Sequence, residues 1–159
     1  MPRYHATAAL LPEGWRDDVA LDVDARGFIT AVTPGTGPAG AERIAGAVVP
    51  GVPNLHCHAF QRAMAGLTER AGPAGDDFWS WRDLMYRFVA RLGPDEMEAI
   101  AAQLQVELLK QGYTAVAEFH YLHNDRDGIA YETPTQLADA VCAAAGATGI
   151  DRKSTRLNS

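Results

Sequence analysis

Two histidines separated by a single residue, His56 and His58, are the side chains of this sequence best suited by type and spacing to chemistry. Alternate side chains of an extended strand point to the same face, so the two imidazoles are expected side by side. Such a pair can hold one divalent metal ion from a rigid support. A catalytic zinc ion usually takes three protein ligands and a water molecule, so the pair supplies part of a site.

The setting of the pair favours a metal site over a chance occurrence of two nearby histidines. Residues 48–55 form an apolar stretch with two prolines and a glycine that predicts a buried strand, and residues 59–67 predict a helix. Polar residues between the carboxyl end of a strand and a following helix are where α/β barrels place their chemistry. Cys57 should face away from the histidines, which favours a packing role, with a thiolate ligand as the alternative.

The remaining elements predict a small β unit followed by alternating strands and helices. Strands are expected at residues 4–11, 18–24, 28–32 and 113–119, residues 42–49 lead into the strand before the histidines, and helices are expected at residues 77–92, 94–110 and 134–145. In the helix at 77–92, the predicted apolar stripe is Trp79, Leu84, Phe88 and Leu92. The order of strands and helices predicts an α/β protein with a parallel sheet. We expect a β segment at 1–47, then at 48–150 the first two βα units of a fold that ordinarily has eight.

Length and composition limit the class of protein. With 159 residues, the chain is shorter than the roughly 250 residues of a closed α/β barrel. The net charge of −6 argues against a nucleic-acid-binding surface, and no apolar run reaches the roughly 18 residues of a membrane span. The two cysteines, Cys57 and Cys142, make no disulfide framework, and the N-terminus has no secretory signal. We therefore expect a cytoplasmic protein that binds neither nucleic acid nor membrane.

Residues 151–159 do not continue the pattern. A third apolar strand is due after Ile150, but the chain reads Asp-Arg-Lys-Ser-Thr-Arg-Leu-Asn-Ser. Three basic residues and one leucine are not the composition of a buried parallel strand. We therefore expect residues 151–159 to be a non-native tail.

Four segments together resemble formimidoylglutamate deiminase, an enzyme of the amidohydrolase superfamily: Leu11 to Trp15, Pro50 to Gly66, Phe78 to Arg82 and Gly112 to Tyr121. The resemblance runs from the N-terminus to about Ile150. It implies the N-terminal part of a TIM-like (β/α)8 metal-dependent hydrolase barrel, incomplete here, preceded by a β-sandwich segment. It also implies one zinc ion and the hydrolysis of N-formimino-L-glutamate to N-formyl-L-glutamate and ammonia in histidine degradation.

The resemblance also implies roles for five residues. His56 and His58 match the first two zinc ligands of the family, and Gln61, Arg82 and Tyr121 match residues that bind the substrate. A small-molecule substrate with carboxylates suits an arginine fork and amide or hydroxyl donors. The later zinc ligands and acid/base groups of the family have no counterpart. We therefore expect no catalytic residues beyond the metal ligands, and an inactive, marginally folded chain.

Several alternatives remain open. Without the resemblance, Arg82 would be a solvated surface arginine, and His120 and His123 are expected to be structural or solvent-facing rather than to support the metal ligands. Glu118 is expected to be buried and hydrogen-bonded. The protein could instead be a guanine- or cytosine-deaminase-type aminohydrolase, which has less need of Arg82, or a non-enzymatic metal-binding module. The metal could also be iron, nickel or copper, and a homodimer of the longer protein stays open.

Overall fold

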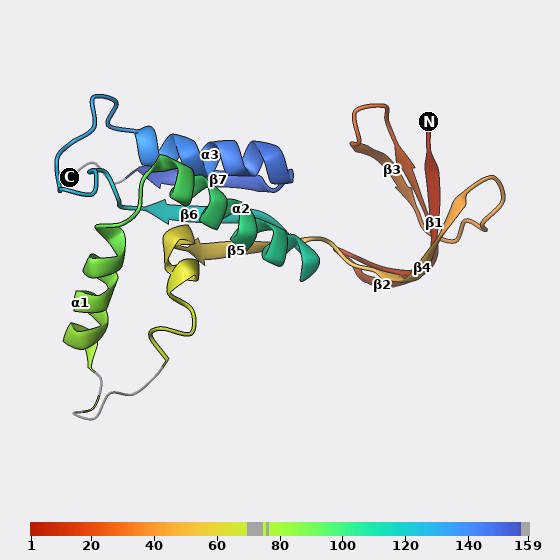
Figure 1. Ribbon diagram of the computed structural model, residues 1–159. Helices are drawn as coiled ribbons and strands as arrows, with labels where there is room; N and C mark the ends of the chain where they lie inside the picture. Colours follow the sequence, from red (N-terminus) through yellow and green to blue (C-terminus); the bar gives the residue numbers. More distant parts are fainter. Residues whose placement is uncertain (70–74, 76, 157–159) are drawn as a thin grey trace. The chain divides into compact units, whose positions relative to one another are not determined.

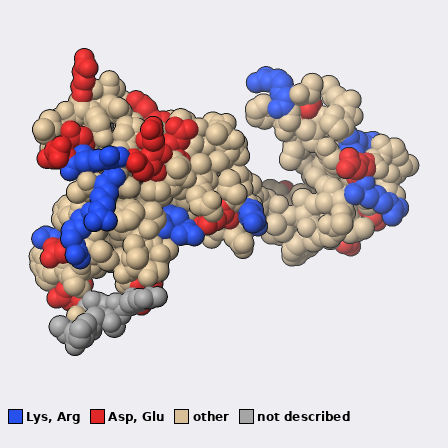
Figure 2. Space-filling view, viewed as in Figure 1, with Lys and Arg blue, Asp and Glu red and all other residues tan. Residues whose placement is uncertain are grey.

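The structure, a computed structural model, describes residues 1–69, 75 and 77–156, and the chain divides into two units (Figure 1). The first unit is Met1–Pro50 and the second begins at Gly51. None of the helices in the described part of the chain has the length and apolar content of a membrane span. Basic and acidic side chains are intermixed over the face shown in Figure 2.

The first unit is a four-stranded sheet with the strand order β3-β2-β1-β4. Its strands are β1 (Arg3–Leu11), β2 (Gly14–Val23), β3 (Ile29–Thr33) and β4 (Glu42–Val48). Strands β1, β2 and β3 pair antiparallel, whereas β4 pairs parallel with β1. The turn before β3 forms because the Asp24 carboxylate accepts hydrogen bonds from the N–H groups of Arg26 and Phe28, each at 2.9 Å. The described residues of this unit form one sheet and not the two layers of a sandwich.

The second unit contains a parallel sheet with the strand order β5-β6-β7. Its strands are β5 (Val52–Cys57), β6 (Tyr113–His120) and β7 (Asp151–Arg156), and its helices are η1 (Ala59–Met64), α1 (Phe78–Val89), α2 (Pro94–Lys110) and α3 (Gln136–Thr148). The α/β class is therefore confirmed. The three strands do not close a barrel, so the eight-stranded barrel stays a prediction.

The helices begin where capping residues satisfy free backbone donors. The Asp77 carboxylate accepts hydrogen bonds from the N–H groups of Trp79 and Ser80, each at 2.9 Å, at the start of α1. Helix α2 starts at Pro94, where the Glu96 carboxylate accepts the Gly93 N–H at 2.9 Å. These local contacts explain why the predicted starts of both helices are correct to within one residue.

The core of the second unit lies between the sheet and the helices. Helices α2 and α3 pack against each other (Figure 1). Leucines of α2 cover Cys57 of β5, Val116 of β6 and Ile150, which directly precedes β7. A second cluster joins η1 and α1 to these helices; its largest members are Phe60, Met64, Met85, Leu92, Met97 and Leu137. The predicted stripe of α1 is partly wrong, because Trp79 is 58% exposed while Met85 is buried and Trp81 packs against the cluster.

Three further expectations differ from the structure. The predicted buried strand at 48–55 is mostly exposed in β5, with Leu55 77% exposed, and among the described strands β5 pairs with β6 alone. The helix expected over residues 59–67 is a short 3₁₀ helix, η1. A strand, β7, forms where we expected none, because backbone pairing at the edge of a sheet does not require apolar side chains. Residues 157–159 of the predicted tail lie outside the described residues.

Candidate metal and substrate site

The two histidines of the predicted metal site lie side by side at the carboxyl end of β5. Their Nε2 atoms are 3.1 Å apart, and the rings meet edge to face with centroids 4.9 Å apart. Two nitrogens that each lie about 2.0–2.1 Å from a tetrahedral zinc ion are separated by about 3.3 Å. The spacing therefore fits two ligands of one metal ion.

The tautomer of His58 is set by a backbone group of the neighbouring strand. Its Nδ1 lies 3.0 Å from the carbonyl oxygen of Phe119 in β6, an oxygen that can only accept, so Nδ1 carries the proton. The Nε2 of His58 is then the acceptor in its 3.1 Å contact with the Nε2 of His56. A hydrogen bond from the second ring nitrogen is the usual support of a metal-binding histidine. The ring also contacts the edges of Phe119 and Tyr121, with centroids at 5.5 and 5.2 Å.

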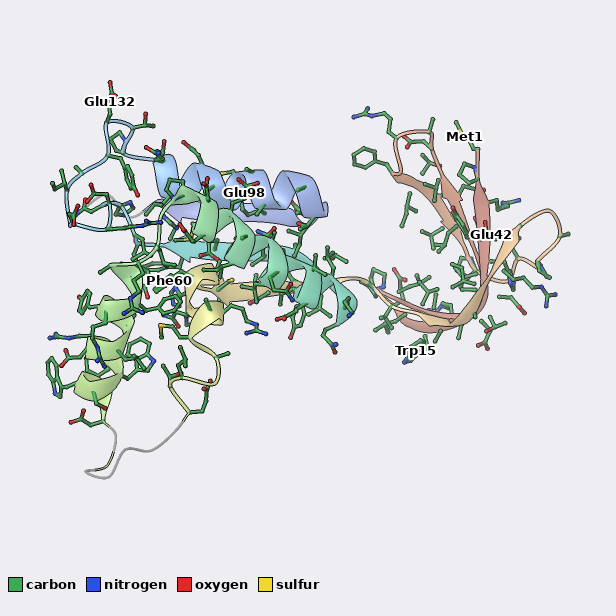
Figure 3. The ribbon with its side chains drawn as sticks, in the orientation of Figure 1. Met1, Trp15, Glu42, Phe60, Glu98 and Glu132 are labelled. Atoms are coloured by element: carbon green, nitrogen blue, oxygen red, sulfur yellow. The ribbon has the colours of Figure 1, made fainter. Side chains whose placement is uncertain are left out.

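Two of the three predicted substrate-binding residues meet beside this pair. The Gln61 side-chain amide donates a hydrogen bond to the Tyr121 hydroxyl oxygen at 2.8 Å, and that hydroxyl points to the Met85 sulfur at 3.7 Å. Tyr121 also packs edge to face on Phe60 of η1, which is labelled in Figure 3. Burial raises the pKa of Tyr121, so its phenol stays protonated at neutral pH and can donate a hydrogen bond.

The third predicted residue, Arg82, lies on α1. Its guanidinium stacks over the ring of Trp79 at 4.6 Å and near that of Tyr86 at 5.7 Å. Its Nε is buried and has no hydrogen-bond partner among the described residues. No hydrogen bond in the described part of the chain joins Arg82 to Gln61, Tyr121 or the histidines. A cavity of about 300 Å³ lies between Tyr86 on this helix and residues 121–128.

Cys57 and Glu118 lie together on the other side of β5. Cys57 is buried against Val116 and Ile150, and its thiol is hydrogen-bonded with the Glu118 carboxyl group. Burial, with a smaller contribution from Glu118, raises the pKa of Cys57, so the thiol stays protonated. Burial also raises the pKa of Glu118, whose Oε1 accepts the Ala59 N–H at 2.8 Å. The packing expected for Cys57 and the burial expected for Glu118 agree with these contacts.

His120 and His123 form a separate pair that does not reach the metal-site histidines. Their ring centroids are 5.6 Å apart, and His120 is buried with its Nε2 2.6 Å from the Leu122 carbonyl oxygen. Burial lowers the pKa of His120. A structural role, as expected, follows for His120.

Some supporting groups gave no signal in the sequence. The Phe119 carbonyl is a backbone group, so its role cannot be recognised from the type of residue at position 119. The Arg62 guanidinium donates two hydrogen bonds to Glu107 at 2.6 and 2.8 Å, which ties η1 to α2 across 45 positions of the chain. Within the described residues, no group of three or more His, Cys, Asp or Glu side chains converges on a metal position. The site in this part of the chain therefore has two donors.

Comparison with known proteins identifies relatives of both units. The family model described as formimidoylglutamate deiminase HutF, N-terminal domain, matches residues 1–46. The formimidoylglutamate deiminase of Pseudomonas aeruginosa is 55% identical over 150 residues, which cover 94% of this chain and 33% of the relative. This chain thus spans about a third of the length of that relative.

Solved structures give the same result for the fold. The crystal structure of an amidohydrolase from Brucella melitensis matches with a TM-score of 0.88 and 43% identity, over 97% of this chain and 34% of that one. A mutant of the atrazine chlorohydrolase TrzN from Arthrobacter aurescens, complexed with zinc and atraton, matches with a TM-score of 0.71. Its identity is 22%, over 98% of this chain and 35% of that one, so it informs on the fold alone.

The fold matches the N-terminal third of solved amidohydrolase structures. Over that span the chain is similar to formimidoylglutamate deiminase, so the resemblance of the four sequence segments is confirmed.

Proposed function

We propose that this chain is the N-terminal part of a zinc-dependent deiminase that hydrolyses N-formimino-L-glutamate to N-formyl-L-glutamate and ammonia, a step of histidine degradation. The observation that carries the proposal is the pair of Nε2 atoms 3.1 Å apart at the end of β5, in a chain 55% identical to such a deiminase. The proposed activity belongs to the longer protein, because this chain spans a third of that relative.

His56 and His58 would hold the metal ion with their Nε2 atoms. The donor set fits zinc, because both groups are imidazoles and His58 is fixed with that nitrogen unprotonated. The chemistry that zinc supplies when bound is Lewis acidity, which activates water near neutral pH.

Arg82, Gln61 and Tyr121 would bind the carboxylates of the substrate. The buried Nε of Arg82 has no acceptor among the described residues, and an unpaired buried donor is costly until an acceptor arrives. Stacking on Trp79 keeps the guanidinium extended and available for a bidentate contact. The Tyr121 hydroxyl and the Gln61 amide, already paired at 2.8 Å, can turn their donors to a second carboxylate oxygen.

A chimera tests the proposal. Residues 1–150 of this chain are joined to the rest of the Pseudomonas aeruginosa relative, and ammonia release from N-formimino-L-glutamate is measured. We expect turnover by the chimera and none after His56→Ala or His58→Ala, with loss of one equivalent of zinc by metal analysis. A chimera that folds and binds zinc but does not release ammonia from this substrate would contradict the proposal.

Arg82→Ala in the same chimera separates the two deaminase classes. For a dicarboxylate substrate, we expect kcat/KM to fall by roughly 10- to 100-fold, since a charged hydrogen bond contributes about 1.5–3 kcal/mol. Arg82→Lys, which keeps the charge but not the fork, should recover only part of the loss. An unchanged kcat/KM, together with turnover of guanine or cytosine, would favour the aminohydrolases that act on uncharged rings.

A further inference from the structure

Glu118 is a buried carboxyl group that contacts both residues flanking His58. The residue is 3% exposed; its Oε1 accepts the Ala59 N–H at 2.8 Å, and the same carboxyl group is hydrogen-bonded with the Cys57 thiol. Cys57 and Ala59 directly precede and follow His58 in the chain. One side chain of β6 therefore contacts the residues on both sides of His58, Cys57 through its thiol and Ala59 through its backbone N–H.

The backbone ladder alone does not hold this part of β5. Asn54 pairs with Val116, but the next pair is Cys57 with Glu118, so β5 carries one residue more than β6 between these two pairs. Such a bulge disrupts the ladder locally and changes the direction of side chains. The side-chain contacts of Glu118 follow directly after the bulge, where the ladder is weakest.

The residue after Glu118 supplies the acceptor that fixes the His58 ring. The Phe119 carbonyl oxygen lies 3.0 Å from Nδ1 of His58. This hydrogen bond forms only if the end of β5 keeps its register against β6. Glu118 contacts Cys57, the last residue of β5 and its own pairing partner, and Ala59, the first residue of η1, so it restrains the chain on both sides of His58.

We propose that Glu118 is a positioning residue that holds His58 with Nδ1 on the Phe119 carbonyl oxygen and Nε2 beside that of His56. It acts through the Cys57 thiol and the Ala59 backbone N–H, on the opposite side of β5 from the two imidazoles. The inference rests on the proposed function only for the claim that the Nε2 atom of His58 binds a zinc ion. The restraint on the ring itself does not depend on that function.

The test uses the ¹⁵N-labelled 159-residue chain, with and without zinc. Two-bond ¹H–¹⁵N spectra of the imidazoles report the tautomer of His58, and competition with a chromophoric chelator reports zinc affinity. Glu118→Leu keeps a similar buried volume without an acceptor, so we expect His58 to shift to a mixture of tautomers and zinc affinity to fall by about tenfold or more. Glu118→Gln keeps an oxygen for the Ala59 N–H and should preserve the wild-type tautomer.

Two further variants complete the design. Glu107→Gln breaks the ion pair between η1 and α2 without touching the residues that flank His58, and should leave the tautomer and zinc affinity unchanged. Ala59→Pro removes the N–H donor at a first helical position where proline is tolerated, although it also restricts the backbone of His58, and it covers the case in which Glu118→Leu does not fold. We expect it to act in the same direction as Glu118→Leu.

A folded Glu118→Leu or Ala59→Pro chain with the wild-type tautomer of His58 would overturn the inference. An unchanged zinc affinity in a variant with a mixed tautomer would overturn the link to metal binding. If the wild-type chain binds no zinc while the tautomer still responds to Glu118, the proposed function fails and the positioning role stands.

Discussion

The side chains around the histidine pair divide into two faces with opposite chemistry. The Nε2 atoms of His56 and His58 meet on one side of β5, whereas the Cys57 thiol and the Glu118 carboxyl group are buried on the other. Burial raises the pKa of both Cys57 and Glu118, so the buried face favours neutral groups. The alternation of a strand thus separates the proposed metal ligands from a thiol that could compete for the metal.

This separation predicts the reactivity of the two cysteines. We expect Cys57 to react with iodoacetamide at least about tenfold more slowly than the less buried Cys142 in the native chain, because only the thiolate is nucleophilic. Alkylation followed by peptide mapping measures both rates, and urea should make them similar. Zinc should not change the rate at Cys57; protection by zinc would instead indicate a thiolate ligand.

At the scale of elements, the start of β5 depends on a close approach between two strands. Thr114 is the residue of β6 that the β5 register skips, and a Cβ built on Gly51 would overlap its side chain. Glycine in such a position marks a place where no side chain fits. The close approach of β5 to β6 at this point therefore requires that residue 51 has no Cβ atom.

Gly51→Ala should lower the free energy of unfolding by about 1–3 kcal/mol through overpacking. Thr114→Gly in the same chain should recover part of this loss, and a double-mutant cycle in urea measures the coupling. Gly146→Ala is the matched control, because nothing lies within 4 Å of a Cβ at this helical position. Equal effects of Gly51→Ala with and without Thr114→Gly would contradict the overlap.

The ion pair between η1 and α2 predicts a dependence on acid. The hydrogen bonds from Arg62, then Gln103, lower the pKa of Glu107 from 4.5 to about 2. Because the folded-state pKa is the lower one, this stabilisation is complete above pH 4.5 and is lost as the pH falls through about 2. Urea midpoints of wild type and Glu107→Gln should therefore differ at neutral pH and converge in acid.

Glu98 is an exposed glutamate of the same helix, and Glu98→Gln is the control for this pH series. Its urea midpoint should run parallel to that of wild type. A Glu107→Gln midpoint that differs from wild type by the same amount at pH 2 and at pH 7 would exclude the ion pair as the cause.

Elements with local signals could be predicted from the sequence. Pro94 with its acidic neighbours marked the start of α2, and the run from Tyr113 marked β6. The failures depend on contacts between distant residues. Trp79 is exposed and Met85 buried because Tyr121 and η1 pack on one side of α1, which helical spacing does not reveal. β7 forms by backbone pairing with β6, so its basic side chains misled the prediction.

At the site, the one-residue spacing of His56 and His58 in a strand predicted that they share a face. The contact between Gln61 and Tyr121, in contrast, had no signal in sequence spacing. The two residues are 60 positions apart, and only the family resemblance grouped them. The position of Arg82 relative to them is likewise not encoded in local pattern, since it depends on how α1 packs. The roles of these residues in zinc and substrate binding stay predictions.

At the scale of the whole chain, the donor count limits what these residues can do alone. Two imidazoles converge in the described part of the chain, where a catalytic zinc site usually has three protein ligands. We expect the 159-residue chain to bind zinc with a micromolar or weaker dissociation constant and to release no ammonia from N-formimino-L-glutamate. Chelator competition and an ammonia assay check both points.

His56→Ala should abolish the weak zinc binding, and Cys142→Ala should leave it unchanged. Tight, stoichiometric zinc binding that raises the melting temperature of the chain would instead indicate a self-contained metal-binding module.

The strand that leads to the histidines, β5, is also an edge strand of the described three-stranded sheet. Among the described strands β5 pairs only with β6, so the amide and carbonyl groups of its far side have no strand partner there. An open edge of this kind is a template for a strand from another molecule. Self-association of the chain at high concentration would begin by strand pairing at β5, next to the two imidazoles. A metal ion bound by these imidazoles would then oppose the pairing of a second molecule at this edge.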